Sequence, residues 1–155
     1  MRTQSIFSAL ALVLALGLAF VGCDDGATGG GGGGTDRALN GSWYQDAIFG
    51  YNFDNGIYTV FDDGPLWRGS YTTSGNQITM TPAEYYINSY LANDYNTTEG
   101  WKNKSQATEI FQRNGWSERD INQGFAPMIA TYSINGNYLY LIYEGRSYTH
   151  TFTRR

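Results

Sequence analysis

Tight-turn dipeptides divide most of the chain into short runs, which leaves little room for long helices. Asn55-Gly56, Gly75-Asn76 and Gly136-Asn137 each separate two runs in which aromatic or β-branched residues alternate with polar ones. Asp63-Gly64 and Glu144-Gly145 mark further turns. Asn and Gly accept the positive φ angles that two-residue hairpins require, and alternation with a period of two is typical of strands with one buried face. The sequence therefore predicts a series of antiparallel hairpins.

Two stretches repeat the same hairpin pattern. Residues 69–80 (GSYTTSGNQITM) and 130–141 (ATYSINGNYLYL) align without gaps, and the turn glycine and the preceding tyrosine of each stretch coincide. The runs along the chain give eight strands, which can close into a barrel or fold as a sandwich. Closure removes exposed strand edges. We therefore expect an all-β domain over residues 40–155, an eight-stranded antiparallel up-and-down barrel.

Residues 82–128, between the fifth and sixth expected strands, predict a short helical insertion. Tyr86, Ile87, Tyr90 and Leu91 recur at helical spacing. Three sets of start and stop signals are typical of short helices: Thr81 with Glu84 and Pro82, Ser105 with Asn114-Gly115, and Ser117 with Gly124. We expect two or three short helices in this insertion.

The start of the chain is typical of an export signal. Arg2 precedes an uncharged apolar stretch over residues 6–21, which is shorter than the ~20 residues of a spanning helix. Residues 20–23, Phe-Val-Gly-Cys, resemble the lipobox of bacterial lipoprotein signal peptides. The resemblance implies that residues 1–22 are a signal peptide and that Cys23 carries a diacylglyceryl group. The alternative is an ordinary secretory signal with an incidental cysteine.

The residues after Cys23, the only cysteine, predict a tether. Residues 23–39 include six consecutive glycines, and a coil of this length has a span of roughly 20–25 Å. The expected location is a bacterial membrane, as a lipoprotein of the outer membrane or cell surface, with the periplasmic face as a further option. Membrane lipid is then a partner through the acylated Cys23.

Gly41-Ser42-Trp43, at the start of the first expected strand, resembles the Gly-x-Trp signature that opens the first strand of lipocalins. The resemblance implies that Trp43 plugs the closed end of the barrel. It also implies that a basic residue after the last strand, Arg154 or Arg155, packs against Trp43. On this resemblance, residues 40–155 form the lipocalin-like barrel of a bacterial lipoprotein.

The charge and motif content does not favour nucleic-acid binding or catalysis. The chain has 10 Lys and Arg against 14 Asp and Glu, without a basic cluster, so no nucleic-acid partner is expected. His150, the only histidine, lies between Tyr148 and Phe152 on one strand face, and catalysis or metal binding would need a second convergent group. Asp62-Asp63 lies at a turn, where solvated carboxylates are common. We expect no enzyme activity, no metal site and no cofactor.

The aromatic residues carry the remaining functional signal. The chain has 13 Tyr, 4 Trp and 8 Phe, and each buried tyrosine hydroxyl needs a partner. Our candidates for ligand binding are Tyr86, Tyr90, Tyr132 and His150. The insertion could be a lid over the barrel mouth, a surface that grips a protein or glycan, or a cover for the outside of the barrel.

The favoured function is that of a lipid-anchored cell-envelope protein whose barrel binds a small apolar or aromatic ligand. The alternative is a surface or periplasmic protein-interaction module of the adhesin or inhibitor type, whose partner is an envelope or host protein. An open cavity would favour the ligand, whereas a filled barrel with an exposed aromatic patch would favour the protein partner.

Overall fold

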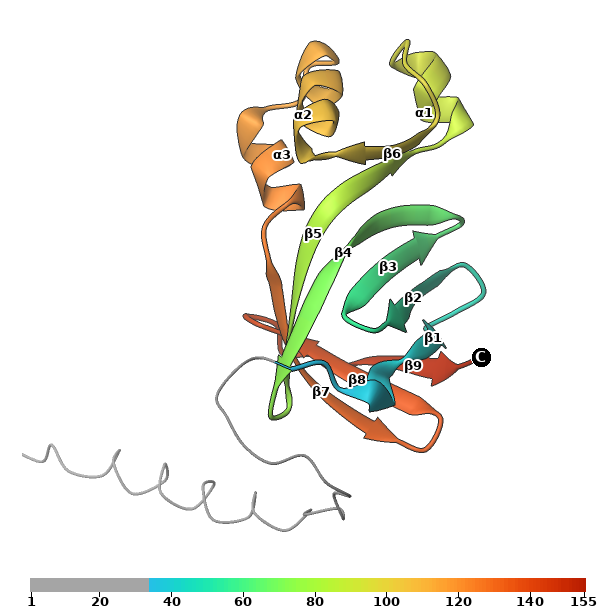
Figure 1. Cartoon of the computed structure of the whole chain (residues 1–155), viewed down its shortest axis with the longest axis vertical. Helices are drawn as coiled ribbons and strands as arrows, with labels where there is room; N and C mark the ends of the chain where they lie inside the picture. Colours follow the sequence, from blue (N-terminus) through green and yellow to red (C-terminus); the bar gives the residue numbers. More distant parts are fainter. Residues whose placement is uncertain (1–33) are drawn as a thin grey trace, which may run out of the picture. The chain divides into compact units, whose positions relative to one another are not determined.

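Strands dominate residues 34–155, the part of the chain that the computed structural model describes (Figure 1). The predicted signal peptide and Cys23 lie outside the described residues. The elements in chain order are η1 (Arg37–Leu39), β1 (Gly41–Tyr44), β2 (Phe49–Asp54), β3 (Ile57–Asp62), β4 (Pro65–Ser74), β5 (Gln77–Ile87), α1 (Ser89–Asp94), β6 (Gly100–Asn103), α2 (Lys104–Arg113), α3 (Glu118–Gly124), β7 (Met128–Asn135), β8 (Tyr138–Tyr143) and β9 (His150–Arg154). Within residues 34–155, no helix is long and apolar enough to cross a membrane.

Eight of the strands close a barrel. The strand order is β4-β3-β2-β1-β9-β8-β7-β5, and an additional pairing between β4 and β5 joins the two ends. Neighbouring barrel strands are antiparallel throughout. The predicted all-β, eight-stranded up-and-down barrel is therefore confirmed. β6 lies outside this ring, because it pairs only with the end of β5.

The repeated stretches form the β4–β5 and β7–β8 hairpins, as predicted. Gly75 and Gly136 have the same φ of 58°, so both copies use the same turn geometry. Asn55 and Gly56, between β2 and β3, have φ angles of 47° and 89°, and positive φ at both positions is the requirement of a type I′ turn. All three turns lie at one end of the barrel, the closed end. The insertion and the remaining loops lie at the other end, the mouth.

The short segment before β1 covers the closed end. Asp36 caps η1 by accepting a hydrogen bond from the Ala38 backbone N–H (2.8 Å). Asp36 also accepts a bond from the Tyr132 hydroxyl (2.8 Å), which joins the segment to β7. Leu39 is completely buried, and its carbonyl accepts a hydrogen bond from Trp43 Nε1 (2.6 Å). The segment is thus fixed to the barrel by both polar and apolar contacts.

Trp43 lies fully buried at this closed end, between the segment and the last strand. Gly41 has a φ of 121°, which residues with a side chain rarely adopt, so the first position of Gly-x-Trp requires glycine. Of the two candidate arginines, Arg154 lies over the Trp43 ring at 4.3 Å and donates to the Ala38 carbonyl (2.6 Å). Arg155 lies over Tyr44 instead.

The insertion begins later than predicted, because residues 82–87 belong to β5. Their capping-box pattern is overridden by pairing with β4 on one side and with β6 on the other. Pro82 falls where β5 changes partner from β7 to β6, so its missing N–H costs no bond on that edge. The first helix, α1, begins after Asn88, whose side chain accepts from the Leu91 N–H (2.9 Å).

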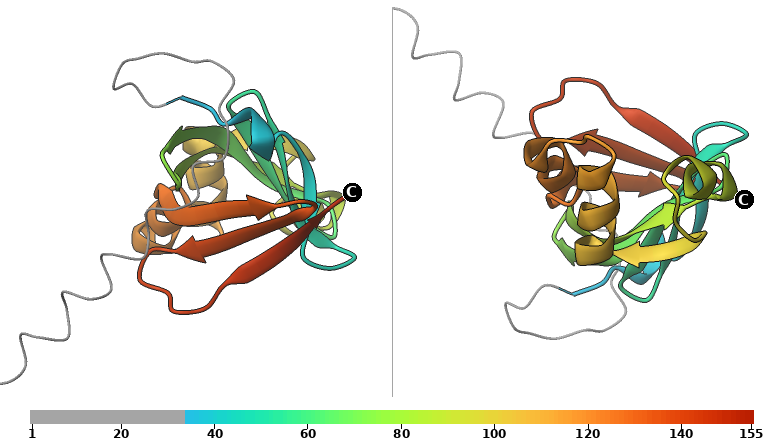
Figure 2. Two further views of the ribbon diagram at one scale, coloured as in Figure 1. Left: turned by 90° about the horizontal axis from the view of Figure 1, so that it is seen from below. Right: turned by 90° about the horizontal axis from the view of Figure 1, so that it is seen from above.

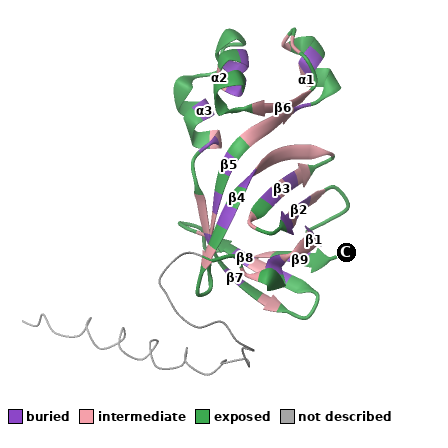
Figure 3. Ribbon diagram, in the orientation of Figure 1, coloured by how far each residue is buried: buried purple, intermediate pink, exposed green. Residues whose placement is uncertain are grey.

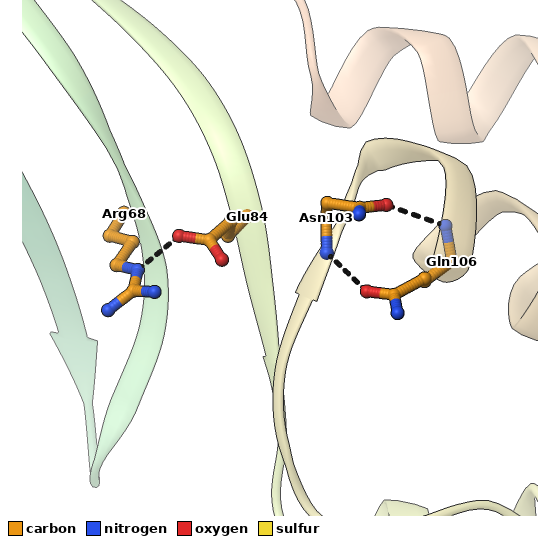
Figure 4. Close-up of polar contacts among 4 residues, drawn as sticks. All are labelled: Arg68, Glu84, Asn103 and Gln106. Carbon is orange, nitrogen blue, oxygen red and sulfur yellow. Dashed lines mark hydrogen bonds and ion pairs between the residues drawn. The ribbon is translucent and has the colours of Figure 1, made fainter.

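The other helix signals are partly correct. α3 begins after Ser117, as predicted, but α2 begins after Asn103 instead of Ser105. Asn103 Oδ1 accepts from the Gln106 N–H (3.0 Å), and Gln106 Oε1 accepts from the Asn103 N–H (3.1 Å), a capping box that is drawn in Figure 4. The cap lies at Asn103 because β6, which the sequence did not predict, ends there.

The buried side chains form two clusters (Figure 3). The larger cluster lies inside the barrel. The smaller one lies between the mouth ends of β4 and β5 and the three helices, which are in the foreground of the view from above in Figure 2. Trp67 on β4 packs against both clusters. The insertion therefore has a core of its own and is joined to the barrel through Trp67.

Candidate functional site

The interior of the barrel is occupied by its own side chains. The largest of these, including Trp43, Phe53, Tyr58 and Tyr71, are less than 2% exposed. Their rings pack closely, with 5.1 Å between the ring centroids of Phe53 and Tyr71. A ligand could therefore enter the interior of the barrel only by displacing these side chains.

The four ligand-binding candidates do not share one pocket. Tyr132 is buried in the barrel and its hydroxyl is bonded to Asp36. Tyr86 lies on β5 and not on a helix, and its hydroxyl donates to Glu99 Oε1 (2.8 Å). Tyr90 lies on α1 and is 71% exposed. Each of these tyrosines has a different environment, so they do not form a common site.

His150, the fourth candidate, begins β9 at the mouth. Its Nδ1 lies 3.3 Å from Gln45 Oε1, and its ring packs near Tyr143 (5.3 Å) and Tyr148 (4.7 Å). These neighbours are an amide and two phenols, so no contact with a carboxylate is found for the imidazole among residues 34–155. Across residues 34–155, no three His, Cys, Asp or Glu side chains are grouped as metal ligands would be.

A cavity of about 230 Å³ lies between the barrel mouth and the helices, and we call it the junction cavity. Most of its surface is apolar, and five of its side chains are aromatic. Its lining comprises Leu66, Trp67, Tyr85, Phe111, Trp116, Asp120, Ile121, Gly124 and Phe125. These residues come from β4, β5, α2, α3 and the segments that flank α3, so the cavity exists only in the folded chain.

Two cross-strand partners form the barrel side of the cavity. Trp67 and Tyr85 face each other on β4 and β5, with their ring centroids 4.6 Å apart and their planes at 74°. The β4–β5 register shifts between Arg68 and Gly69, just beside Trp67. Gly69 is required there, because a Cβ atom would lie 2.0 Å from the Thr81 carbonyl oxygen. The bulge thus directs Trp67 and Tyr85 toward the helices.

The helices supply the other side of the cavity. Phe111 on α2 packs against Tyr85 (5.1 Å) and against Trp116 (5.1 Å). Phe125, which follows α3, meets Trp67 edge to face at 5.3 Å. Gly124 permits this approach, since a Cβ atom there would lie 3.0 Å from the Trp67 ring. The aromatic rings therefore hold the insertion against the barrel and at the same time surround the cavity.

The polar groups of the cavity are few. Asp120 is exposed at the rim, and its Oδ2 accepts a hydrogen bond from the Ser117 hydroxyl (2.7 Å). Burial, reinforced by the neighbouring Tyr95, raises the pKa of the Tyr85 phenol above its ordinary value, so Tyr85 is neutral at physiological pH. Trp116 is 48% exposed, which places it beside solvent. The cavity thus combines aromatic sides with one carboxylate at its rim.

The outer face of the same strands carries an ion pair that fixes β6. Arg68 Nε donates to Glu84 Oε2 across the β4–β5 pair (Figure 4), and the Arg68 guanidinium lies 4.4 Å from the centre of the Trp101 ring. The hydrogen bond from Arg68 holds the pKa of Glu84 below its usual value, so the pair stays charged at neutral pH. These contacts stabilise the strands from the side opposite the cavity.

None of the four candidates predicted from the sequence lines the cavity, and one incorrect element explains why Tyr86 was selected and Tyr85 was not. If residues 82–91 formed a helix, Tyr86 and Tyr90 would lie on the same face of it, and for this reason both were predicted to bind the ligand. In a strand, neighbouring residues point to opposite faces, so Tyr85 points toward the helices and Tyr86 away from them. The aromatic density of the insertion was the signal that could have indicated Phe111, Trp116 and Phe125.

Comparisons with protein-family models, curated proteins and solved structures found no match to this chain.

Proposed function

We propose that this chain is a lipid-anchored cell-envelope protein that binds a small apolar or aromatic ligand in the junction cavity. The observation that carries the proposal is the cavity itself, which has five aromatic side chains and a mostly apolar surface. Pockets for small molecules are usually concave and apolar, with few polar groups. The proposal differs from the sequence prediction in its location, because the interior of the barrel is occupied.

The size of the cavity limits the ligand. An apolar cavity of about 150 Å³ accommodates benzene, and drug-sized ligands occupy about 300–1,000 Å³. The junction cavity, at about 230 Å³, lies between these values. A compound with one or two rings, or a branched group of similar size, therefore fits.

The anchoring part of the proposal rests on sequence alone. The residues around Cys23 resemble a lipobox, and the glycines that follow suit a tether. A lipocalin-like origin of the barrel is supported by Gly41, by Trp43 at the closed end and by the Arg154 guanidinium over the Trp43 ring.

A protein-interaction module is the second candidate function. Trp116 and Tyr90, both on the insertion, are 48% and 71% exposed, and aromatic side chains of this kind are frequent anchors in protein interfaces. A protein partner would cover these side chains without entering the cavity.

Calorimetric titration of the full-length purified protein with indole, a neutral two-ring probe, tests the ligand hypothesis. Trp116→Ala removes one aromatic contact, which is worth about 0.5–1.5 kcal/mol, so the affinity should fall roughly 2- to 12-fold. Tyr138→Ala is the matched control, because Tyr138 is also 48% exposed but begins β8 at the closed end. Equal effects of the two substitutions on indole binding would reject the junction cavity as the site.

A further inference from the structure

The charges around the junction cavity are asymmetric. Asp120 is the only charged residue in its lining, which contains no Lys, Arg or His. Lys104 lines the neighbouring groove between α2 and α3 instead. A ligand in the cavity would therefore meet a carboxylate at the rim, whereas the lining residues supply no positive side chain.

The aromatic rings favour the same sign of charge. The face of an aromatic ring is electron-rich and attracts cations, and cages of several rings bind methylated ammonium groups. Neighbouring rings of the cavity stand nearly at right angles, at 74° for Trp67 and Tyr85 and at 86° for Trp67 and Phe125. The rings that line the cavity therefore lie in different planes.

One ring of the cavity already binds a cation from outside. The Lys104 ammonium lies 5.8 Å from the centre of the Phe125 ring, a distance within the range of cation–π attraction. The formal charge of the whole chain is −4, which also favours the approach of cations.

We propose that the ligand of the junction cavity is a small organic cation, such as a methylated ammonium compound, held by the aromatic rings and by Asp120. This proposal rests on the proposed function, since it needs the cavity to bind a ligand, and it adds the charge of that ligand. The positive group lies among the rings, while the carboxylate compensates its charge at the rim.

The test compares two probes of the same shape. Choline and its neutral carbon analogue, 3,3-dimethylbutan-1-ol, are titrated into the full-length protein by calorimetry. Choline should bind roughly tenfold more tightly, because only the cation gains from the ring faces and from Asp120. Asp120→Asn, at an exposed position, should lower the affinity for choline up to about fivefold and leave the affinity for the neutral analogue unchanged. Lys104→Gln should raise the affinity for choline only, since it removes the competing ammonium from the Phe125 ring.

The outcomes separate the two proposals. Equal binding of choline and its neutral analogue, or binding of indole without choline, would overturn the cation hypothesis and leave the proposed function standing. If Asp120→Asn lowered the affinities for choline and for the neutral analogue equally, the cation hypothesis would also be overturned, because a purely structural role of Asp120 would change both affinities. Failure of choline, the neutral analogue and indole to bind would overturn the proposed function as well.

Discussion

The Tyr58 hydroxyl predicts a substitution that stabilises the protein. Tyr58 lies on β3, is 0% exposed, and its Oη has no hydrogen-bond partner among residues 34–155. A buried polar group without a partner costs about 1–3 kcal/mol, because it loses its bonds to water and gains none. Tyr58→Phe keeps the ring and removes the hydroxyl. The free energy of unfolding should therefore rise, by about 1 kcal/mol or more.

Tyr132→Phe is the matched comparison. Tyr132 is also buried in the barrel, but its hydroxyl donates to Asp36 Oδ2 at 2.8 Å. A hydrogen bond to a charged group contributes about 1.5–3 kcal/mol, so Tyr132→Phe should lower the free energy of unfolding. The same chemical change thus has opposite signs at the two positions.

Urea titrations of the two variants and of the unmodified protein, followed by far-UV circular dichroism, measure both effects. The slope of unfolding free energy with urea should be the same for all three proteins, so that midpoints can be compared directly. If Tyr58→Phe destabilised the protein as much as Tyr132→Phe, the Tyr58 hydroxyl would have a partner, and the assignment of an unpaired group would be wrong.

Three further predictions concern the core, the closed end and the anchor. Burial raises the pKa values of Tyr51 and Tyr143 above about 10, which is the value in the unfolded chain. The free energy of unfolding should therefore be largest below pH ~10 and should fall as the pH rises further. A urea midpoint that stayed constant between about pH 9 and pH 11 would contradict this. Trp43→Ala should lower the free energy of unfolding by about 3–5 kcal/mol, and Trp101→Ala, on the outer face, should lower it by much less. If urea titrations gave equal losses of unfolding free energy for the two variants, Trp43 would not be the plug at the closed end of the barrel. Cys23→Ser should abolish incorporation of a clickable fatty acid in cells, and label retained by this variant would refute anchoring through Cys23.

Local signals in the sequence were enough to predict the barrel. Each hairpin depends on two or three turn residues and on alternation within the adjoining strands, which are properties of short segments. The equal φ angles of Gly75 and Gly136 show why the repeated stretches indicated the same structure. The strand count followed from these segments, and closure followed from the need to pair both edges.

The candidate site could not be predicted in the same way. The capping pattern at Thr81 and Glu84 is a valid local signal, but pairing of β5 with β4 and β6 outweighs it. That pairing decides which of Tyr85 and Tyr86 points toward the helices. The junction cavity then depends on contacts between β4 and residues nearly sixty positions later, such as Trp67 with Phe125, and no local pattern encodes such a contact.

Hydrogen exchange of the full-length protein, with and without bound indole, tests the central claim most directly. Binding in the junction cavity should slow the exchange of backbone amides in α2, in α3 and at the mouth ends of β4 and β5. The amides of β1 and β9 at the closed end should exchange at the same rate in both states. Slower exchange in β2, β3 and β8 without any change in α2 and α3 would place the ligand inside the barrel and contradict the account.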